Sequence, residues 1–127
     1  MRVIIAGGRD YQLSNKDFTI LDYFKSKVEV TEIVSGGCRG ADYGGELWAQ
    51  KNKIKVIKFP VDWNKYGKIA GLIRNAEMAV YADCLVLFPG GKGSTNMLEI
   101  AKEFNLDIYK IKDGNMFKTI YEKSREE

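Results

Sequence analysis

Short apolar runs alternate with longer amphipathic stretches along the whole chain. Five of these runs are continuous enough to predict strands that are buried on both faces of a parallel sheet. Pro60 ends the third run, and glycines follow closely after the first, second and fourth. The predicted strands are Val3–Ala6, Ile33–Val34, Ile54–Phe59, Cys84–Phe88 and Ile108–Ile111.

The stretches between these runs place apolar side chains at helical spacing. A capping-box-like segment, Ser14–Asp17, predicts the start of the first helix. Further helices are predicted at about residues 41–52, 69–80 and 97–104. A terminal helix with a frayed end is predicted at residues 113–127.

The alternation of strands and helices predicts a single α/β domain that covers residues 1–127. We expect a Rossmann-like three-layer sandwich around a mostly parallel five-strand sheet. Trp48, Met97 and Phe104 are expected in its core. The polar and aromatic segment 61–71 predicts a loop of functional length.

Composition and charge narrow the function classes. No apolar run approaches the roughly 20 residues of a membrane-spanning helix, and the N-terminal run is too short for a signal peptide, which predicts a cytoplasmic protein without membrane contact. Cys38 and Cys84 lie in unlike contexts, which predicts two free thiols. The net charge of +3 suits a protein that binds a small anion. It argues against nucleic acid as the partner, because a DNA-binding domain carries a dense basic stripe.

The chain contains no histidine. This excludes Ser-His-Asp and Cys-His nucleophile systems as well as histidine zinc sites. Any catalysis would have to use carboxylates, Lys, Tyr, Cys or the substrate itself. We expect neither a metal site nor a cofactor.

Three of the predicted strands end in glycine clusters, at residues 7–10, 35–40 and 89–95. In a parallel sheet these clusters would share the carboxyl edge, where open α/β folds bind their ligands. Glycine lets the backbone approach a ligand closely, and the N–H groups at a helix start attract phosphate. A tight strand-to-helix turn is the structural alternative for each cluster alone. None of them matches the Gly-x-Gly-x-x-Gly or P-loop patterns.

Several motifs in order along the chain resemble the YspA-like branch of the SLOG superfamily. The resemblance extends over roughly residues 1–111 and rests on residues 34–42, 62–68, 70–71, 74–75, 78–79 and 82–94. It implies a Rossmann-like fold, a nucleotide-type ligand and a homodimer or higher homo-oligomer. The superfamily includes the Lonely Guy phosphoribohydrolases, which release cytokinin bases from nucleotides. It also includes the DNA-processing protein DprA and domains proposed to sense signals such as ADP-ribose derivatives.

The resemblance to Lonely Guy enzymes is incomplete at one position that matters. Their Pro-Gly-Gly-x-Gly-Thr-x-x-Glu motif supplies phosphate-binding amides and a catalytic glutamate. Ser94 stands here for the threonine, but Met97 occupies the position of the glutamate. Glu99 lies two residues further on, about 200° around a helix, and cannot simply replace it. This departure argues against an enzyme, and we assign no catalytic residue.

The candidate site residues fall into two groups. In the Lonely Guy enzymes an arginine a few residues before a Met-Ala pair serves catalysis, and Arg74 falls at that position. We expect Arg74 to contact the ligand, because it opens a helix after a glycine-bearing loop; snorkelling or pairing with Glu77 is the alternative. The expected phosphate-binding residues are Gly7, Gly8, Arg9, Ser35, Gly36, Gly37, Arg39, Gly40, Arg74, Asn75, Gly90, Gly91, Gly93, Ser94 and Thr95. Candidates for base or ribose contact are Asp10, Asp42, Asp62, Trp63, Tyr66 and Lys68.

Each residue of the second group also has a structural interpretation. Asp10 and Asp42 follow glycine loops near helix starts and could equally cap those helices. Trp63 and Tyr66 could stack on a base or pack within their own loop. Asp62 could instead form a turn, and Lys68 could be a solvated surface residue. Outside this group, Cys38 is better explained as a small turn residue than as a reactive thiol.

We therefore expect a protein that senses or sequesters a small phosphorylated nucleotide, either ADP-ribose-like or cyclic. Phosphates would sit on the amides of residues 36–37 and 90–94. Two alternatives stay open. One is a nucleotide N-glycosidase of the phosphoribohydrolase type, with another carboxylate in the role of the missing glutamate. The other is a DprA-like protein that binds single-stranded DNA.

Overall fold

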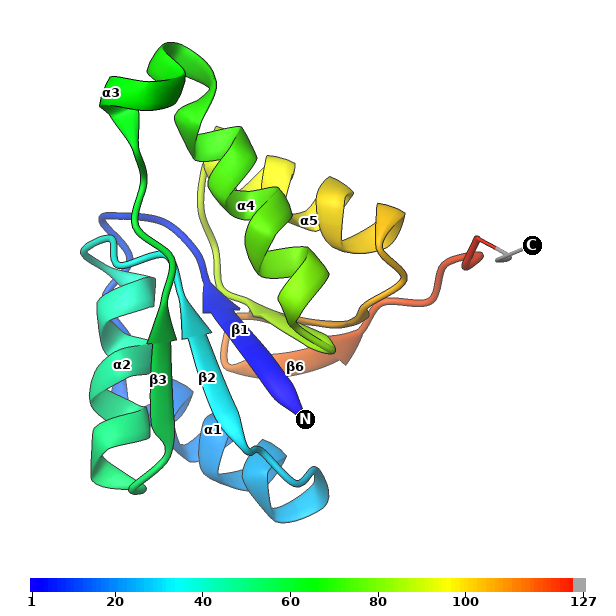
Figure 1. Cartoon of the computed structure of the whole chain (residues 1–127). Helices are drawn as coiled ribbons and strands as arrows, with labels where there is room; N and C mark the ends of the chain where they lie inside the picture. Colours follow the sequence, from blue (N-terminus) through cyan, green and yellow to red (C-terminus); the bar gives the residue numbers. More distant parts are fainter. Residues whose placement is uncertain (125–127) are drawn as a thin grey trace.

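The computed structural model describes residues 1–124 and contains one six-stranded sheet flanked by helices (Figure 1). The sheet order is β3-β2-β1-β4-β5-β6; the first five strands are parallel to their neighbours, and β6 is antiparallel to β5. The strands are β1 (Arg2–Ala6), β2 (Glu32–Ser35), β3 (Lys55–Lys58), β4 (Cys84–Leu87), β5 (Asp107–Lys112) and β6 (Asn115–Lys118).

Helices cover both faces of the sheet, which confirms the Rossmann-like three-layer sandwich. One face packs against α1 (Asn15–Lys27) and α2 (Ala41–Lys51), and the other against α4 (Ala70–Tyr81) and α5 (Lys92–Glu103). The short α3 (Trp63–Tyr66) and the 3-10 turn η1 (Gly67–Ile69) lie beyond the carboxyl end of β3, at the top of Figure 1. The predicted capping box at the start of α1 is present, with Ser14 and Asp17 bonding each other's backbone N–H.

The core follows the central strands. All four residues of β4 are buried, and along β1 the side chains alternate between the two apolar layers. Trp48 and Met97 are buried, as predicted. The expectation for Phe104 was wrong: its side chain is 45% exposed, because Phe104 is the C-cap of α5 and lies past the last turn that faces the sheet.

The predicted terminal helix is wrong, because residues 115–118 form a strand, β6. The sheet therefore has six strands, one more than predicted. Asp113 and Gly114 both have positive φ, at 50° and 74°, and form a two-residue turn after β5. An Asp-Gly pair favours this kind of hairpin turn, so the chain returns as β6 along β5. Residues 119–124 form neither helix nor strand, and the predicted frayed end at 125–127 lies outside the described residues.

The segment 61–71 is more ordered than the predicted loop. It contains α3 and η1, and α4 begins within it at Ala70. The carboxylate of Asp62 accepts a hydrogen bond of 3.0 Å from the Lys65 amide, so Asp62 caps α3. This cap satisfies one of the backbone N–H groups that are otherwise free at the start of α3.

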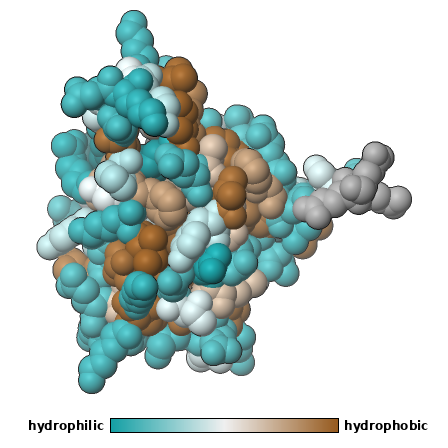
Figure 2. All heavy atoms as spheres, in the orientation of Figure 1, coloured by the Kyte–Doolittle hydropathy of each residue, from teal (hydrophilic) through white to brown (hydrophobic). Residues whose placement is uncertain are grey.

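The surface has apolar positions along α4 among mostly polar ones (Figure 2). Ile69, Leu72 and Val80 are all about half exposed or more. Cys38 and Cys84 are both free thiols, as predicted. No helix within residues 1–124 combines the length and the apolar character needed to cross a bilayer.

Two helix glycines should respond in opposite ways to alanine. A Cβ at Gly45 of α2 would lie 2.7 Å from Cγ2 of the fully buried Ile5, so Gly45→Ala should destabilise the protein by about 1–3 kcal/mol through overpacking. A Cβ at Gly71 of α4 meets no described atom within 4 Å, so Gly71→Ala should stabilise by up to about 1 kcal/mol. Urea unfolding of both variants tests this, and a shift in the same direction would contradict the packing of α2 on β1.

Candidate functional site

A cleft of about 360 Å³ lies at the carboxyl edge of the sheet, where the strand order changes direction. The chain proceeds from β1 to β2 and β3 on one side, and then crosses to β4 on the other side of β1. In open α/β sheets such a switch point is where ligands bind, because the loops after the two strands diverge there. The lining residues are Ala6, Gly7, Gly8, Arg9, Cys38, Asp42, Arg74, Asn75, Met78, Gly91, Lys92, Gly93, Ser94 and Met97.

Arg74 of α4 provides a buried positive charge in this cleft. Its side chain is only 9% exposed. Its Nη1 donates to the Gly36 carbonyl, its Nε donates to Asn75 Oδ1 at 3.1 Å, and its Nη2 lies 3.9 Å from Cys38 Sγ. Within residues 1–124 no carboxylate oxygen comes within 4.0 Å of this guanidinium, so the alternative of pairing with Glu77 is not realised.

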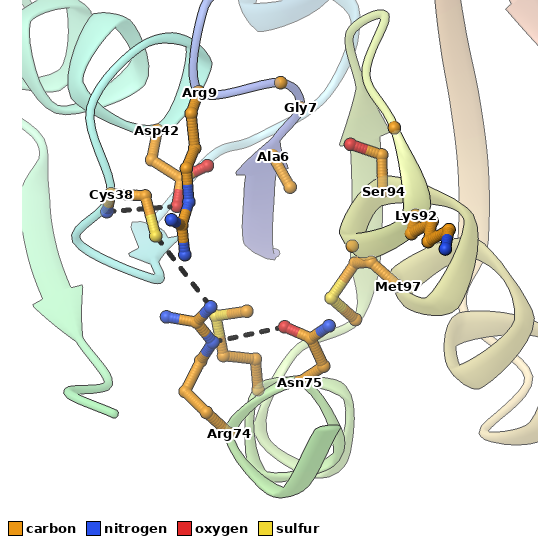
Figure 3. Close-up of a pocket in the computed structure, with 14 residues that line it drawn as sticks. Ala6, Gly7, Arg9, Cys38, Asp42, Arg74, Asn75, Lys92, Ser94 and Met97 are labelled. Atoms are coloured by element: carbon orange, nitrogen blue, oxygen red, sulfur yellow. Dashed lines mark hydrogen bonds between the residues drawn. The ribbon is translucent and has the colours of Figure 1, made fainter. Parts of the chain in front are cut away.

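Arg9 brings a second guanidinium to the cleft from the loop after β1. Figure 3 shows its side chain running down into the space above Arg74. None of the ion pairs found in the described part of the chain involves Arg9. Two guanidinium groups that face one space without carboxylate partners make the cleft electropositive, and each can bind an oxyanion in a bidentate way.

The N-terminus of α5 forms the opposite wall. Its N-cap, Gly91, offers no side-chain hydrogen bond to the first turn. The amides of Lys92, Gly93 and Ser94 make no hydrogen bond to an acceptor in the described residues, whereas the Thr95 amide bonds the Gly91 carbonyl. These free N–H groups and the positive end of the helix dipole attract anions.

Asp42 is the one carboxylate that lines the cleft within the described residues. It is 6% exposed and accepts a 3.3 Å hydrogen bond from the Cys38 amide. Burial raises the pKa of Asp42 to about 6, against the opposing effects of that hydrogen bond, Arg74 and Arg9. A carboxyl group with this pKa can hold or release a proton near neutral pH, and when ionised it can accept hydrogen bonds from a sugar.

The floor of the cleft is apolar where the resembling enzymes carry their glutamate. Met97 of α5 is 2% exposed and lines the cleft together with Met78 of α4. Ser94, one turn earlier on α5, faces the same space (Figure 3). The position of Met97 therefore carries no group that could ionise or transfer a proton.

The loop at residues 35–40 supports the cleft more than it lines it. The Gly37 amide donates to Ser35 Oγ at 3.1 Å, and Ser35 Oγ donates to the buried Glu46 at 2.6 Å. The Gly36 carbonyl accepts from Arg74. The Gly8 amide is likewise occupied by the Pro89 carbonyl, at 2.8 Å. These bonds fix the loops, and they occupy the amides of Gly8 and Gly37, the two groups among them that could donate to a phosphate.

Several predicted ligand residues lie away from the cleft. Arg39 and Asp10 form an exposed ion pair of 3.0 Å beside it. Trp63 and Tyr66 are on α3 and do not line it. The other predicted residues outside its lining are Ser35, Gly36, Gly37, Gly40, Asp62, Lys68, Gly90 and Thr95.

Five residues that line the cleft are absent from the predicted site residues: Ala6, Cys38, Met78, Lys92 and Met97. Cys38 was interpreted as a small turn residue. A signal was present for Met97, because it follows Ser94 by three positions and so shares its helix face.

Comparison with known proteins relates this geometry to a family. The profile of the YspA, cpYpsA-related SLOG family matches residues 1–66. This segment spans β1 to α3 and includes the first two glycine loops. The Gene 61 protein of Mycobacterium phage D29 is 27% identical over 124 residues, which cover 88% of this chain and 97% of that protein.

Among solved structures, the DNA processing protein A (DprA) of Streptococcus pneumoniae superposes with a TM-score of 0.66 at 19% identity. The superposition covers 89% of this chain and 52% of DprA, so the chain spans about half the length of that protein. At this level of identity the likeness shows the fold.

The raised pKa of Asp42 predicts a pH dependence of stability. The group binds its proton more tightly in the folded protein, at a pKa of about 6, than in the unfolded chain, at 3.8. The contribution of Asp42 to stability should therefore be greatest below pH 3.8 and fall as the pH rises to about 6, by about 3 kcal/mol at roughly 1.4 kcal/mol per pKa unit.

Asp42→Asn removes this titration while it keeps an acceptor for the Cys38 amide. Urea unfolding at several pH values should show that the variant gains stability relative to the wild type as the pH rises from 4 to 7. Parallel pH profiles of the two proteins would contradict the assignment.

Proposed function

The chain belongs to the YspA, cpYpsA-related SLOG family, and from this premise we propose that its cleft binds a small phosphorylated nucleotide. The protein would hold this ligand as a sensor or a sequestering protein. The ligand would be ADP-ribose-like or cyclic. Support for the proposal comes from the guanidinium groups, the free amides and the carboxyl group that line the cleft.

The observation that carries the proposal is the buried guanidinium of Arg74 without a carboxylate within ion-pair distance. Removing a charge from water costs several kcal/mol unless another charge or several hydrogen bonds compensate. Two neutral oxygen acceptors, Gly36 O and Asn75 Oδ1, compensate for part of this cost. An anionic ligand would supply the rest.

Phosphate oxygens would be bound from both sides of the cleft. The amides of Gly93 and Ser94 would donate from α5, and the guanidinium groups of Arg9 and Arg74 would donate from the opposite walls. Lys92 adds a further positive charge at the rim. This arrangement favours a ligand with one or two phosphates over a neutral nucleoside.

The sugar and base would lie beside the phosphates. Asp42 and Asn75 offer acceptors and donors for a ribose or a base edge. Asn75 is itself oriented by Asn96, to which its Nδ2 donates at 2.9 Å. Trp63 stays a proposed stacking partner, because α3 lies at the same sheet edge and its indole is 54% exposed.

A nucleotide N-glycosidase is the second candidate function, and Asp42 is the observation that favours it. A carboxyl group with a pKa of about 6 that faces the cleft is suited to acid–base chemistry on a bound nucleotide. Met97 argues against this function, because it occupies the position of the glutamate in the resembling enzymes.

Incubation with AMP followed by chromatography separates binding from hydrolysis. We expect intact AMP and no free adenine. If the wild type released adenine and Asp42→Asn did not, the protein would be an enzyme and the binding proposal would be replaced.

Three further expectations stay proposals. Single-stranded DNA remains an alternative ligand because of the fold shared with DprA, and the mild net charge of +3 argues against it. A homodimer is supported by the exposed apolar side chains along α4. A cytoplasmic location rests on the sequence argument alone.

Two arginine variants test the phosphate site directly. Arg9→Gln removes a guanidinium that faces the cleft, so AMP affinity measured by calorimetry should fall roughly 10- to 100-fold, as expected for a hydrogen bond to a charged group. Arg39→Gln is the matched control, because Arg39 is an exposed loop arginine outside the cleft lining, and it should leave AMP affinity unchanged. Equal losses in both variants would indicate general charge attraction, and the absence of binding to both AMP and ADP-ribose would contradict the proposed function.

A further inference from the structure

A second recess, of about 520 Å³, shares Arg9 with the cleft and is lined by residues of the loops after β1 and β2 and of α1 and α2. These two helices cover one face of the sheet (Figure 1). One wall is the loop after β1 with the start of α1, which contributes Leu13 and Phe18. The other wall is α2, which contributes Tyr43 and Leu47. We call this recess the α1–α2 groove.

The groove combines apolar walls with a polar rim. Tyr43 is 56% exposed and Leu47 41%, and the two lie one turn apart on the same face of α2. The rim carries the Arg39–Asp10 ion pair. An apolar recess with a few polar groups at its edge is typical of a small-molecule site.

The groove and the cleft are separated by a single layer of backbone. Arg9 lines both recesses, and its side chain runs into the cleft (Figure 3). Gly40 of the groove packs directly on this layer: a Cβ there would lie 2.3 Å from the Gly8 carbonyl oxygen and 2.4 Å from that of Arg9. Arg9 is thus common to both recesses, and a ligand whose phosphate is bound by its guanidinium in the cleft would extend over this layer of backbone to reach the groove.

The two recesses also differ in chemistry. The cleft presents guanidinium groups and free amides, whereas the groove presents an exposed phenol ring and a leucine. Each recess alone has the size of a typical ligand pocket, so a mononucleotide would fill one and leave the other empty. A ligand with two nucleoside units joined through phosphates would place one unit in each.

We propose that the α1–α2 groove binds the second nucleoside unit of a dinucleotide-type ligand, whose phosphates are held at Arg9. The base would pack on the ring of Tyr43 and the side chain of Leu47, as bases stack on aromatic side chains in other sites. This inference rests on the proposed function of the cleft, because the groove by itself offers little to bind a phosphate.

Two ligands test the inference on the full chain. Diadenosine diphosphate has two adenosine units joined by a diphosphate, whereas ADP has one adenosine and a free terminal phosphate with one more negative charge, which favours ADP in the electropositive cleft. Calorimetry should show that diadenosine diphosphate binds roughly tenfold tighter than ADP, because one more base is stacked.

Variants of the groove should affect the two ligands differently. Tyr43→Ser and Leu47→Glu should each lower the affinity for diadenosine diphosphate roughly tenfold and leave that for ADP unchanged. Tyr23→Ser is the control, because Tyr23 is 62% exposed on α1 and outside the groove lining. Circular dichroism of each variant verifies that it is folded.

The possible failures are distinguishable. If both ligands bind with equal affinity and the groove variants change neither, the groove inference is wrong and the proposed function of the cleft stands. If the groove variants weaken a single-stranded oligonucleotide instead, the groove accommodates nucleic acid and the inference is also wrong. If neither nucleotide binds, the proposed function and the groove inference fail together.

Discussion

Arg74 places a positive charge inside the protein without a carboxylate in ion-pair range, and the candidate site is arranged around that charge. Its hydrogen bond to the Gly36 carbonyl ties α4 to the loop after β2, across the end of β1. Arg74 and the Cys38 amide both act to lower the pKa of Asp42, but burial outweighs them and raises it to about 6. The guanidinium is thus oriented by neutral groups and keeps the capacity to bind an anion.

The fold makes this arrangement stable by dividing the helices between the two faces of the sheet. Arg74, Met78 and Met97 come from the face of α4 and α5, whereas Asp42 and Cys38 come from the loop and helix that lead onto the other face. Behind the cleft, Lys58 forms an ion pair with Glu46, and Glu46 accepts a hydrogen bond from the Ser35 hydroxyl. The same hydroxyl accepts a hydrogen bond from the Gly37 amide. This chain of contacts keeps the loop at residues 36–38 in place, so Arg74 meets a rigid acceptor.

Much of this could be predicted from the sequence because it depends on local patterns. Continuous apolar runs gave the five parallel strands, and the glycine clusters after three of them predicted one shared edge. The sixth strand was missed because Met116 to Tyr121 fit a helical spacing, although the Asp113–Gly114 turn signal was present. Arg9 and Arg39 could not be distinguished, since both lie in glycine clusters; only the folded loops show that Arg9 lines the cleft and that Arg39 lines the groove alone. The sequence identifies Met97 as a departure from the Lonely Guy motif. That Met97 lies on the floor of the cleft could be seen only in the structure, because it depends on how α5 packs against α4.

We expect an oxyanion to bind between Arg74 and the first turn of α5. Titration of ¹⁵N-labelled protein with AMP, followed by amide and arginine Nε–H spectra, can detect this binding. The amides of Gly93 and Ser94 and the Nε–H of Arg74 should shift together and saturate at one ligand concentration. Saturable shifts confined to other parts of the molecule, with these three signals unmoved, would contradict it.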